Sequence, residues 1–193
     1  MYYRVLRLAV VPLALTLAAS VAGAQRRGAA ARRAAVPFTF AVAGGLSVPT
    51  GDLGDAVGTG FHLEGMAAHR LQSAPITLRA ELAYHAFGSK DVTAGSTTTS
   101  VDAHTIALVG NAVYDLRTNL RERPYLIGGL GAYDVTGTVK VNGTSSSNSD
   151  WKLGANVGGG VRFLLGGMRS FVEVRYHIVD QASYLPISFG VQF

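Results

Sequence analysis

Apolar residues recur at every second position in a series of segments between residue 37 and the end of the chain. Successive side chains of a β-strand point to opposite faces, so this alternation predicts strands with one apolar face and one polar face. Turn-forming residues separate the segments. We predict eight strands, at residues 38–48, 61–71, 76–86, 106–116, 125–135, 151–163, 172–178 and 185–193.

The charged residues of these segments lie on the face opposite to the apolar one. In the segment 125–135, we assign Tyr125, Ile127 and Tyr133 to the apolar face and Asp134 to the polar face. A shift of one residue would exchange the two faces of a strand, so this separation of charge specifies the register. The polar face supplies the candidates for an internal charge network: Glu64, Arg79, Glu81, Arg162, Glu173 and Arg175.

The polar face also contains many small residues, among them Ala68, Gly128 and Gly158. Glycine is unfavourable on a solvated strand face, whereas the narrow interior of an eight-stranded barrel needs small residues beside large ones. Aromatic residues such as Phe61 and Trp151 lie near the ends of the apolar stripes, as in the girdles of membrane barrels. Strands in lipid must pair all their backbone groups and therefore close. We predict an all-β fold, an eight-stranded antiparallel up-and-down transmembrane β-barrel.

The connections between the predicted strands alternate in length, which places short and long connections at opposite ends of the barrel. The short connections are residues 72–75, 117–123 and 164–169. The long connections, rich in Gly, Ser, Thr and Asp, are residues 49–60, 88–103 and 136–150. Their composition is typical of exposed loops that make variable contacts.

The start of the chain has the pattern of a secretory signal. Arg4 and Arg7 precede a short apolar stretch, and small residues end it at Ala22 and Ala24. A basic region, an apolar region and an A-x-A site together predict a signal peptide over residues 1–24, cleaved after Ala24. Residues 25–36 are a basic linker rich in Ala and Arg, and residues 37–193 form the barrel domain.

The net charge of +5 does not indicate nucleic acid as a partner. Its excess comes from the signal peptide and the linker, whose arginines are Arg4, Arg7, Arg26, Arg27, Arg32 and Arg33. The barrel domain is close to neutral. The sequence has no Cys, which excludes disulfides, thiolate metal sites and a Cys nucleophile.

The predicted signal peptide, the eight amphipathic strands and the terminal Phe193 resemble the small outer-membrane β-barrels of the OmpA and OmpX type. Residues 44–52 and 123–131 are similar to strands of that family. The resemblance implies a monomer in the bacterial outer membrane, in contact with its lipids and lipopolysaccharide, with the long connections outside the cell. Phe189, Val191 and Phe193 resemble the C-terminal signal that such proteins present to the barrel-assembly machinery.

Turn geometry predicts part of the register inside the barrel. A four-residue turn between Leu71 and Ile76 would place His62 opposite His85, and a two-residue turn at residues 166–167 would place Gly158 opposite Arg175. Long charged side chains would then lie over glycines and form salt bridges. Eight strands leave an interior about wide enough for side chains, so we predict a filled lumen. A narrow channel of low conductance is the alternative.

Three histidines, His62, His85 and His177, are predicted to point inward near the mouth of the barrel. We expect His177 to lie across the barrel from the other two and therefore predict no metal site. No catalytic motif or cofactor motif occurs in the sequence. We predict a non-enzymatic structural or surface-interaction protein whose surface ligand the sequence does not identify. A lipid-modifying enzyme that uses His104 is a further alternative.

Overall fold

The computed structural model describes residues 38–193, except for residues 72–73, 95–96, 117, 119–120 and 142–143. The predicted signal peptide, its cleavage site and the basic linker lie outside the described residues. Within the described part, no helix is both long enough and apolar enough to cross a membrane.

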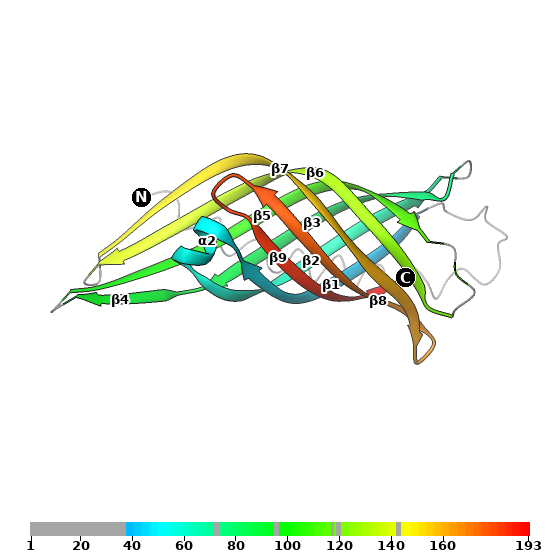
Figure 1. The fold of residues 1–193 in the computed structure, drawn as a ribbon, viewed down its shortest axis with the longest axis horizontal. Coiled ribbons are helices and arrows are strands. Elements are labelled where there is room, and N and C mark those ends of the chain that lie inside the picture. Colours follow the sequence, from blue (N-terminus) through cyan, green and yellow to red (C-terminus); the bar gives the residue numbers. More distant parts are fainter. Residues whose placement is uncertain (1–37, 72–73, 95–96, 117, 119–120, 142–143) are drawn as a thin grey trace, which may run out of the picture. The chain divides into compact units, whose positions relative to one another are not determined.

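The described part of the chain is an antiparallel β-sheet that closes on itself (Figure 1). Neighbours in sequence are neighbours in the sheet, and β9 pairs with β1 while β3 pairs with β5. The strands are β1 (Phe38–Pro49), β2 (Gly58–Arg70), β3 (Ile76–Gly88), β4 (Lys90–Ala94), β5 (Thr97–Asp115), β6 (Arg123–Val141), β7 (Thr144–Leu165), β8 (Met168–Val179) and β9 (Tyr184–Gln192). The prediction of an eight-stranded up-and-down barrel is confirmed, because β4 continues β3 beyond Ser89 along the same partner strand.

Two of the three predicted long connections are strands rather than loops. Residues 88–103 contain β4 and the start of β5, and residues 136–150 form the far part of the β6–β7 hairpin. Alternating Ser, Thr and Val residues favour extended backbone there. The prediction of loops was wrong at these two places because a polar composition does not exclude strands. The remaining connection, residues 49–60, contains the short helix α2 (Gly51–Ala56) before β2 begins.

These extended hairpins define one end of the barrel, which we call the hairpin end. The opposite end, which we call the turn end, holds the short connections between β2 and β3, β5 and β6, and β7 and β8 (Figure 1). Gly166 and Gly167 make the β7–β8 turn with positive φ angles of 58° and 85°. Both angles lie in the left-handed region that glycine adopts without strain, as a tight hairpin requires.

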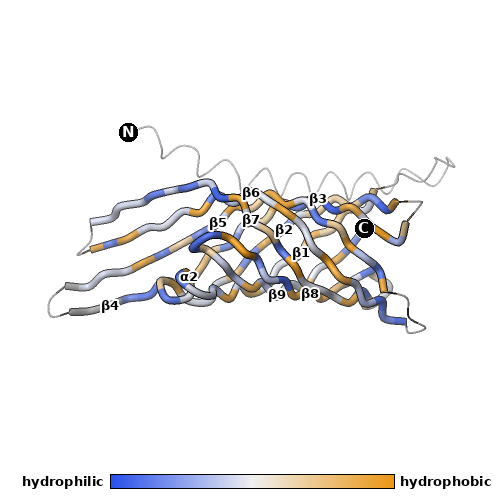
Figure 2. Tube along the Cα trace, turned by 45° about the horizontal axis from the view of Figure 1, so that its top comes forward, coloured by the Kyte–Doolittle hydropathy of each residue, from blue (hydrophilic) through white to orange (hydrophobic). Residues whose placement is uncertain are grey.

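The predicted apolar face is turned outward along seven of the eight predicted strands. Large exposed side chains lie on β1, β2, β3, β5, β7, β8 and β9, and Figure 2 shows hydrophobic and hydrophilic residues alternating along the barrel. Leu153 (84% exposed), Phe61 (62%) and Trp151 (65%) are examples. An outward apolar face of this kind is the arrangement of a barrel surrounded by lipid.

The prediction for β6 had the two faces exchanged. Tyr125, Ile127 and Tyr133 are buried inside the barrel, whereas Leu126 and Leu130 face outward with 54% and 73% exposure. The error arose because both faces of this segment carry apolar residues, so local alternation does not distinguish them.

Pairing with β5 decides the orientation of β6. Ala107 and Val113, both fully buried, lie opposite Tyr133 and Ile127. Asp134 lies opposite the exposed Trp151 on the outward side, so one charged residue does occupy the apolar face.

Candidate functional site

The middle of the lumen is occupied by ion pairs around Arg175. Its Nη2 atom lies 2.6 Å from Oε2 of Glu64 and 2.7 Å from Oε1 of Glu81, and its Nε atom lies 2.8 Å from Oε1 of Glu173. All four side chains are at most 1% exposed. Charges taken out of water require partners of opposite sign, and Arg175 bridges carboxylates from three different strands.

A second guanidinium, that of Arg79, closes this network. Its two terminal nitrogens hold both oxygens of Glu173 at 2.9 and 2.7 Å, in the bidentate geometry that suits arginine and carboxylate. Arg79 also lies 3.1 Å from Glu81. The hydroxyl of Tyr125 donates to Glu173 at 2.7 Å.

Glycines on β7 make room for these long side chains. Gly158 lies opposite Arg175 and Gly160 lies opposite Glu173, as the turn geometry predicts. A Cβ atom on Gly158 would lie 2.7 Å from Cα of Arg175, and one on Gly160 would lie 2.5 Å from Cζ of Tyr125. Neither distance is compatible with a real side chain, so the close approach of β8 and of the Tyr125 ring requires glycine at these positions.

Arg162 does not join the network, contrary to the prediction. It pairs instead with Asp115, which also accepts a hydrogen bond from Arg70 at 2.6 Å. Its guanidinium lies over the ring of Tyr125, 4.3 Å from the ring centre. Arg162 lies near the end of β7 toward the turn end, where Asp115 at the end of β5 offers a closer carboxylate.

A layer of histidines lies next to the charge network, toward the hairpin end. His62 is opposite His85, as predicted. The hydroxyl of Ser47 lies 3.1 Å from Nδ1 of His62 and 2.8 Å from Nδ1 of His85. His62 Nε2 lies 2.9 Å from the hydroxyl of Ser188. All four residues are buried, so they form a polar layer inside the barrel.

His177 belongs to the same layer: it lies across the barrel from His85, as expected, but the side chains of the two residues meet inside the lumen. The two imidazole centres are 6.1 Å apart. His177 stacks on Tyr184 at 4.8 Å and lies 3.1 Å from the hydroxyl of Tyr133. The interior is so narrow that side chains from opposite walls meet. Among the described residues, no group of three or more His, Cys, Asp or Glu is arranged to hold a metal ion.

Apolar side chains cover the histidine layer at the hairpin end. Leu53 of α2, Val57 and Phe87 are buried in one cluster with Tyr184. The helix is held in place by a backbone hydrogen bond from Thr50 to Ser183 of 3.0 Å, just before its first residue. The mouth of the barrel is therefore lined by packed side chains over a polar layer.

The two long hairpins beyond this mouth are polar and tied to each other by side chains. Lys140 of β6 donates to Asp102 of β5 at 2.8 Å, and Ser89 also donates to Asp102. These two hydrogen bonds stabilise the carboxylate and hold the pKa of Asp102 below its ordinary value. Thr138 and Ser147 are hydrogen bonded across the β6–β7 hairpin at 2.9 Å.

The remaining predicted residues lie on the outer wall or at the end of the chain. Phe189 and Phe193 are about half exposed on the apolar face, and Val191 is paired with Val42 of β1. Phe193 exchanges two backbone hydrogen bonds with Phe40, of 2.9 and 3.0 Å. His104 lies on the outer wall, with its ring 5.9 Å from that of Tyr84.

Sequence reasoning missed the neutral partners of the interior. Tyr125, Tyr133 and Tyr184 were assigned to the outside or left unassigned, and Ser47 and Ser188 were not singled out. The two serines could have been found from the register, because they share a face of β1 and β9 with the inward glycines. The tyrosines of β6 could not have been found in this way, because the alternation of residues along the strand is the same whether a tyrosine faces outward or inward.

A closed antiparallel barrel with a charged interior and an apolar exterior is the architecture of outer-membrane proteins. The family model for the outer membrane protein beta-barrel domain matches residues 12–192 of this chain. The chain belongs to this family. Outer-membrane barrels in general have their longer loops outside the cell and their short turns in the periplasm.

Two solved structures share the fold of this outer-membrane barrel. Neisserial surface protein A is 19% identical, with a TM-score of 0.55 over 83% of this chain and 98% of its own. A major outer membrane protein from Thermus thermophilus is 12% identical, with a TM-score of 0.58 over 81% of this chain and 98% of its own. At these identities the likeness shows the fold. Among curated proteins, no sequence matches this barrel.

Proposed function

We propose that this protein is a rigid, non-enzymatic outer-membrane scaffold that presents its β4–β5 and β6–β7 hairpins to partners outside the cell. The observation that carries the proposal is the buried network around Arg175, which fills the lumen from wall to wall with paired charges. Breaking such a network leaves unpaired charges in a narrow interior, so the lumen is suited to stability rather than to transport.

The hairpins support the second half of the proposal. They extend beyond the apolar belt, expose Ser and Thr side chains, and are braced by the Asp102–Lys140 pair. Polar segments on a rigid scaffold are where binding residues are most often found. The neisserial structure of the same fold is itself named a surface protein.

Planar bilayer recordings test the filled lumen. We expect the purified barrel to give at most small and infrequent conductance steps. Large, stable steps of porin size would favour the alternative of a channel. Activity on lipopolysaccharide that is lost in His104→Ala would favour the alternative of a lipid-modifying enzyme.

Hairpin exchange tests the surface role. Residues 89–102 and 137–148 are each replaced by a tight Asn-Gly turn, which leaves the barrel strands intact. We expect the trimmed protein to keep the slow gel migration that heating abolishes, the mark of a folded barrel. Cells that carry it should lose the binding to a glycan and matrix-protein array that cells with the full hairpins show. Equal binding by both would contradict the surface role.

The proposal includes the export route. Cleavage after Ala24 would give a mature chain that begins at Gln25, followed by insertion as a monomer into lipid and lipopolysaccharide. Phe189, Val191 and Phe193 would be the residues presented to the barrel-assembly machinery. Mass spectrometry of the outer-membrane form tests the cleavage site, and cross-linking in the membrane tests the monomer.

A further inference from the structure

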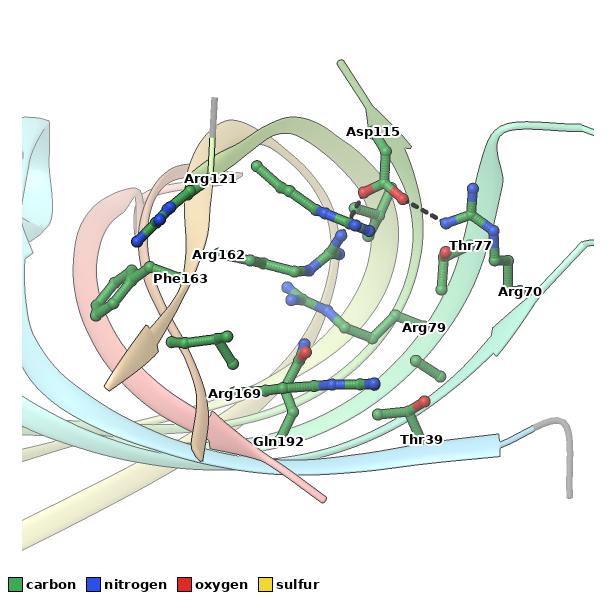
Figure 3. Close-up of a pocket in the computed structure, with 14 residues that line it drawn as sticks. Thr39, Arg70, Thr77, Arg79, Asp115, Arg121, Arg162, Phe163, Arg169 and Gln192 are labelled. Carbon is green, nitrogen blue, oxygen red and sulfur yellow. Dashed lines mark hydrogen bonds and ion pairs between the residues drawn. The ribbon is translucent and has the colours of Figure 1, made fainter. Parts of the chain in front are cut away.

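The turn end of the barrel contains a cavity of about 530 Å³ in which arginine is the most frequent lining residue (Figure 3). Among the described residues that line it, Asp115 is the one carboxylate. Figure 3 shows guanidinium groups from several strands directed into the same space. The arginines of the lining are Arg70, Arg79, Arg121, Arg123, Arg162 and Arg169.

These arginines differ in how far their charge is neutralised. Arg79 is paired with Glu173 and Glu81 in the network above, and Asp115 is shared by Arg70 and Arg162. Arg121, Arg123 and Arg169 form no ion pair with any residue that the structure describes. The cavity therefore carries an excess of positive charge on three arginines that are exposed to solvent. Like charges that share one cavity still repel each other.

Apart from Asp115, no Asp or Glu among the described residues lines this space. Residues 25–36, which precede the barrel in sequence, contain four arginines and no Asp or Glu. Glu122, between Arg121 and Arg123 in sequence, is exposed and does not line the cavity. An external anion would remove the repulsion among the arginines.

Arginine is the side chain best suited to phosphate, because its planar fork donates two parallel hydrogen bonds to two oxygens. The walls of the cavity also hold Thr39, Thr77 and Gln192, whose neutral side chains can donate further hydrogen bonds. The volume lies within the range of about 300–1,000 Å³ that is usual for small-ligand sites.

We propose that this cavity is a binding site for a ligand that carries phosphate groups, reached from the periplasmic side, with Arg121, Arg123 and Arg169 as its main contacts. The phosphate could be that of a lipid headgroup of the inner leaflet or that of a soluble periplasmic compound. Both sources present the same chemistry to the arginines, and the experiment separates them.

The test compares two triple variants that remove equal charge at opposite ends of the barrel. Arg121→Gln/Arg123→Gln/Arg169→Gln removes the three unpaired arginines. The matched control, Lys90→Gln/Lys140→Gln/Lys152→Gln, removes three positive charges from the hairpin end. Heat-dependent gel migration verifies that each variant is a folded barrel before any binding is measured.

In the soluble arm, pyrophosphate is titrated calorimetrically into the full barrel in non-ionic detergent at low salt. In the lipid arm, the barrel is reconstituted in phosphatidylcholine nanodiscs with and without cardiolipin, and its thermal midpoint is recorded. We expect the arginine variant to bind pyrophosphate at least tenfold more weakly, or to lose the rise in thermal midpoint that cardiolipin causes. The lysine variant should keep the response of the wild-type protein.

A response in the soluble arm identifies a free phosphate compound as the source, and a response in the lipid arm alone identifies a headgroup. Either response must depend on the three arginines to support the site. If wild-type protein responds in neither arm, or if both variants lose the response equally, the proposal is overturned. An equal loss in both variants would mean that the response depends on the net charge of the barrel and not on this cavity.

Discussion

Arg175 on β8 and Glu64 on β2 form an ion pair of 2.6 Å across the lumen, although two other strands separate β8 from β2 in the sheet. Both side chains are almost completely buried. The pair therefore connects distant parts of the barrel wall through its interior. The same guanidinium also holds Glu81 and Glu173, so three buried carboxylates share it as a partner.

Arg175→Met is expected to destabilise the folded barrel strongly. It removes the partner shared by three buried carboxylates and leaves Arg79 as the one remaining guanidinium of the network. Loss of one partner of a buried ion pair costs about 3–5 kcal/mol. The free energy of unfolding is measured by urea titration in detergent micelles, with Arg169→Gln as the control on the same strand. If the two variants were equally stable, the network would not contribute to the fold.

A double-mutant cycle separates Arg79 from Arg162. Arg79 holds Glu173 with two hydrogen bonds, whereas Arg162 pairs with Asp115. We expect a coupling energy of about 1–3 kcal/mol between Arg79→Gln and Glu173→Gln, because residues in one network couple at this scale. The cycle of Arg162→Gln with Glu173→Gln should give a smaller coupling, because among the described residues these two are connected only through Tyr125. Equal coupling in both cycles would place Arg162 inside the network after all.

The pairing of residues on neighbouring strands was predictable wherever a short turn connects the two strands. The connection from Leu71 to Ile76 placed His62 opposite His85, and the Gly166–Gly167 turn placed Gly158 opposite Arg175. In both places the loop length determines which residues face each other. The contacts across the lumen were not predictable, because the meeting of His177 with His85 depends on the diameter of the closed barrel rather than on any local pattern.

The face of β6 was not predictable for a different reason. Leu126 and Leu130 on one face are matched by the apolar Ile127 and Val135 on the other. Only the pairing of β6 with β5 orients the strand, and that pairing is a property of the whole sheet. The polar hairpins were likewise missed because Ser and Thr were read as loop residues, although Thr favours strands.

Single cysteines test the orientation of β6, which is practicable because the natural chain has none. We expect spin labels at Leu126→Cys and Leu130→Cys to collide readily with oxygen dissolved in lipid. A label at Ile127→Cys should be shielded from it, since that side chain is 3% exposed and faces the lumen. If the label at Ile127→Cys were the most accessible to oxygen, Ile127 would face the lipid, as predicted from the sequence.

The bond between the two hairpins should depend on pH. Hydrogen bonds from Lys140 and Ser89 lower the pKa of Asp102, so the folded carboxyl titrates below its ordinary value of 3.8. The contribution of this pair is thus fully present above that value and is lost as the pH falls through the lower, folded pKa. NMR titration of the Asp102 carboxyl carbon measures the pKa directly. Lys140→Gln should move the midpoint back toward 3.8, and an unchanged midpoint would contradict the pair.

Gly158→Ala tests whether the close approach of β8 dictates the small residue of β7 beside the charge network. The added Cβ would lie 2.7 Å from Cα of Arg175 and would also contact the carbonyl oxygen of Val174. Both neighbours are backbone atoms that cannot rotate away, so we expect a loss of at least about 1–3 kcal/mol in the free energy of unfolding. Gly65→Ala is the matched control, because a Cβ there would meet no atom within 4 Å on the lipid-facing side. A similar loss at both positions would show that the cost comes from strand glycines in general and not from the approach of Arg175.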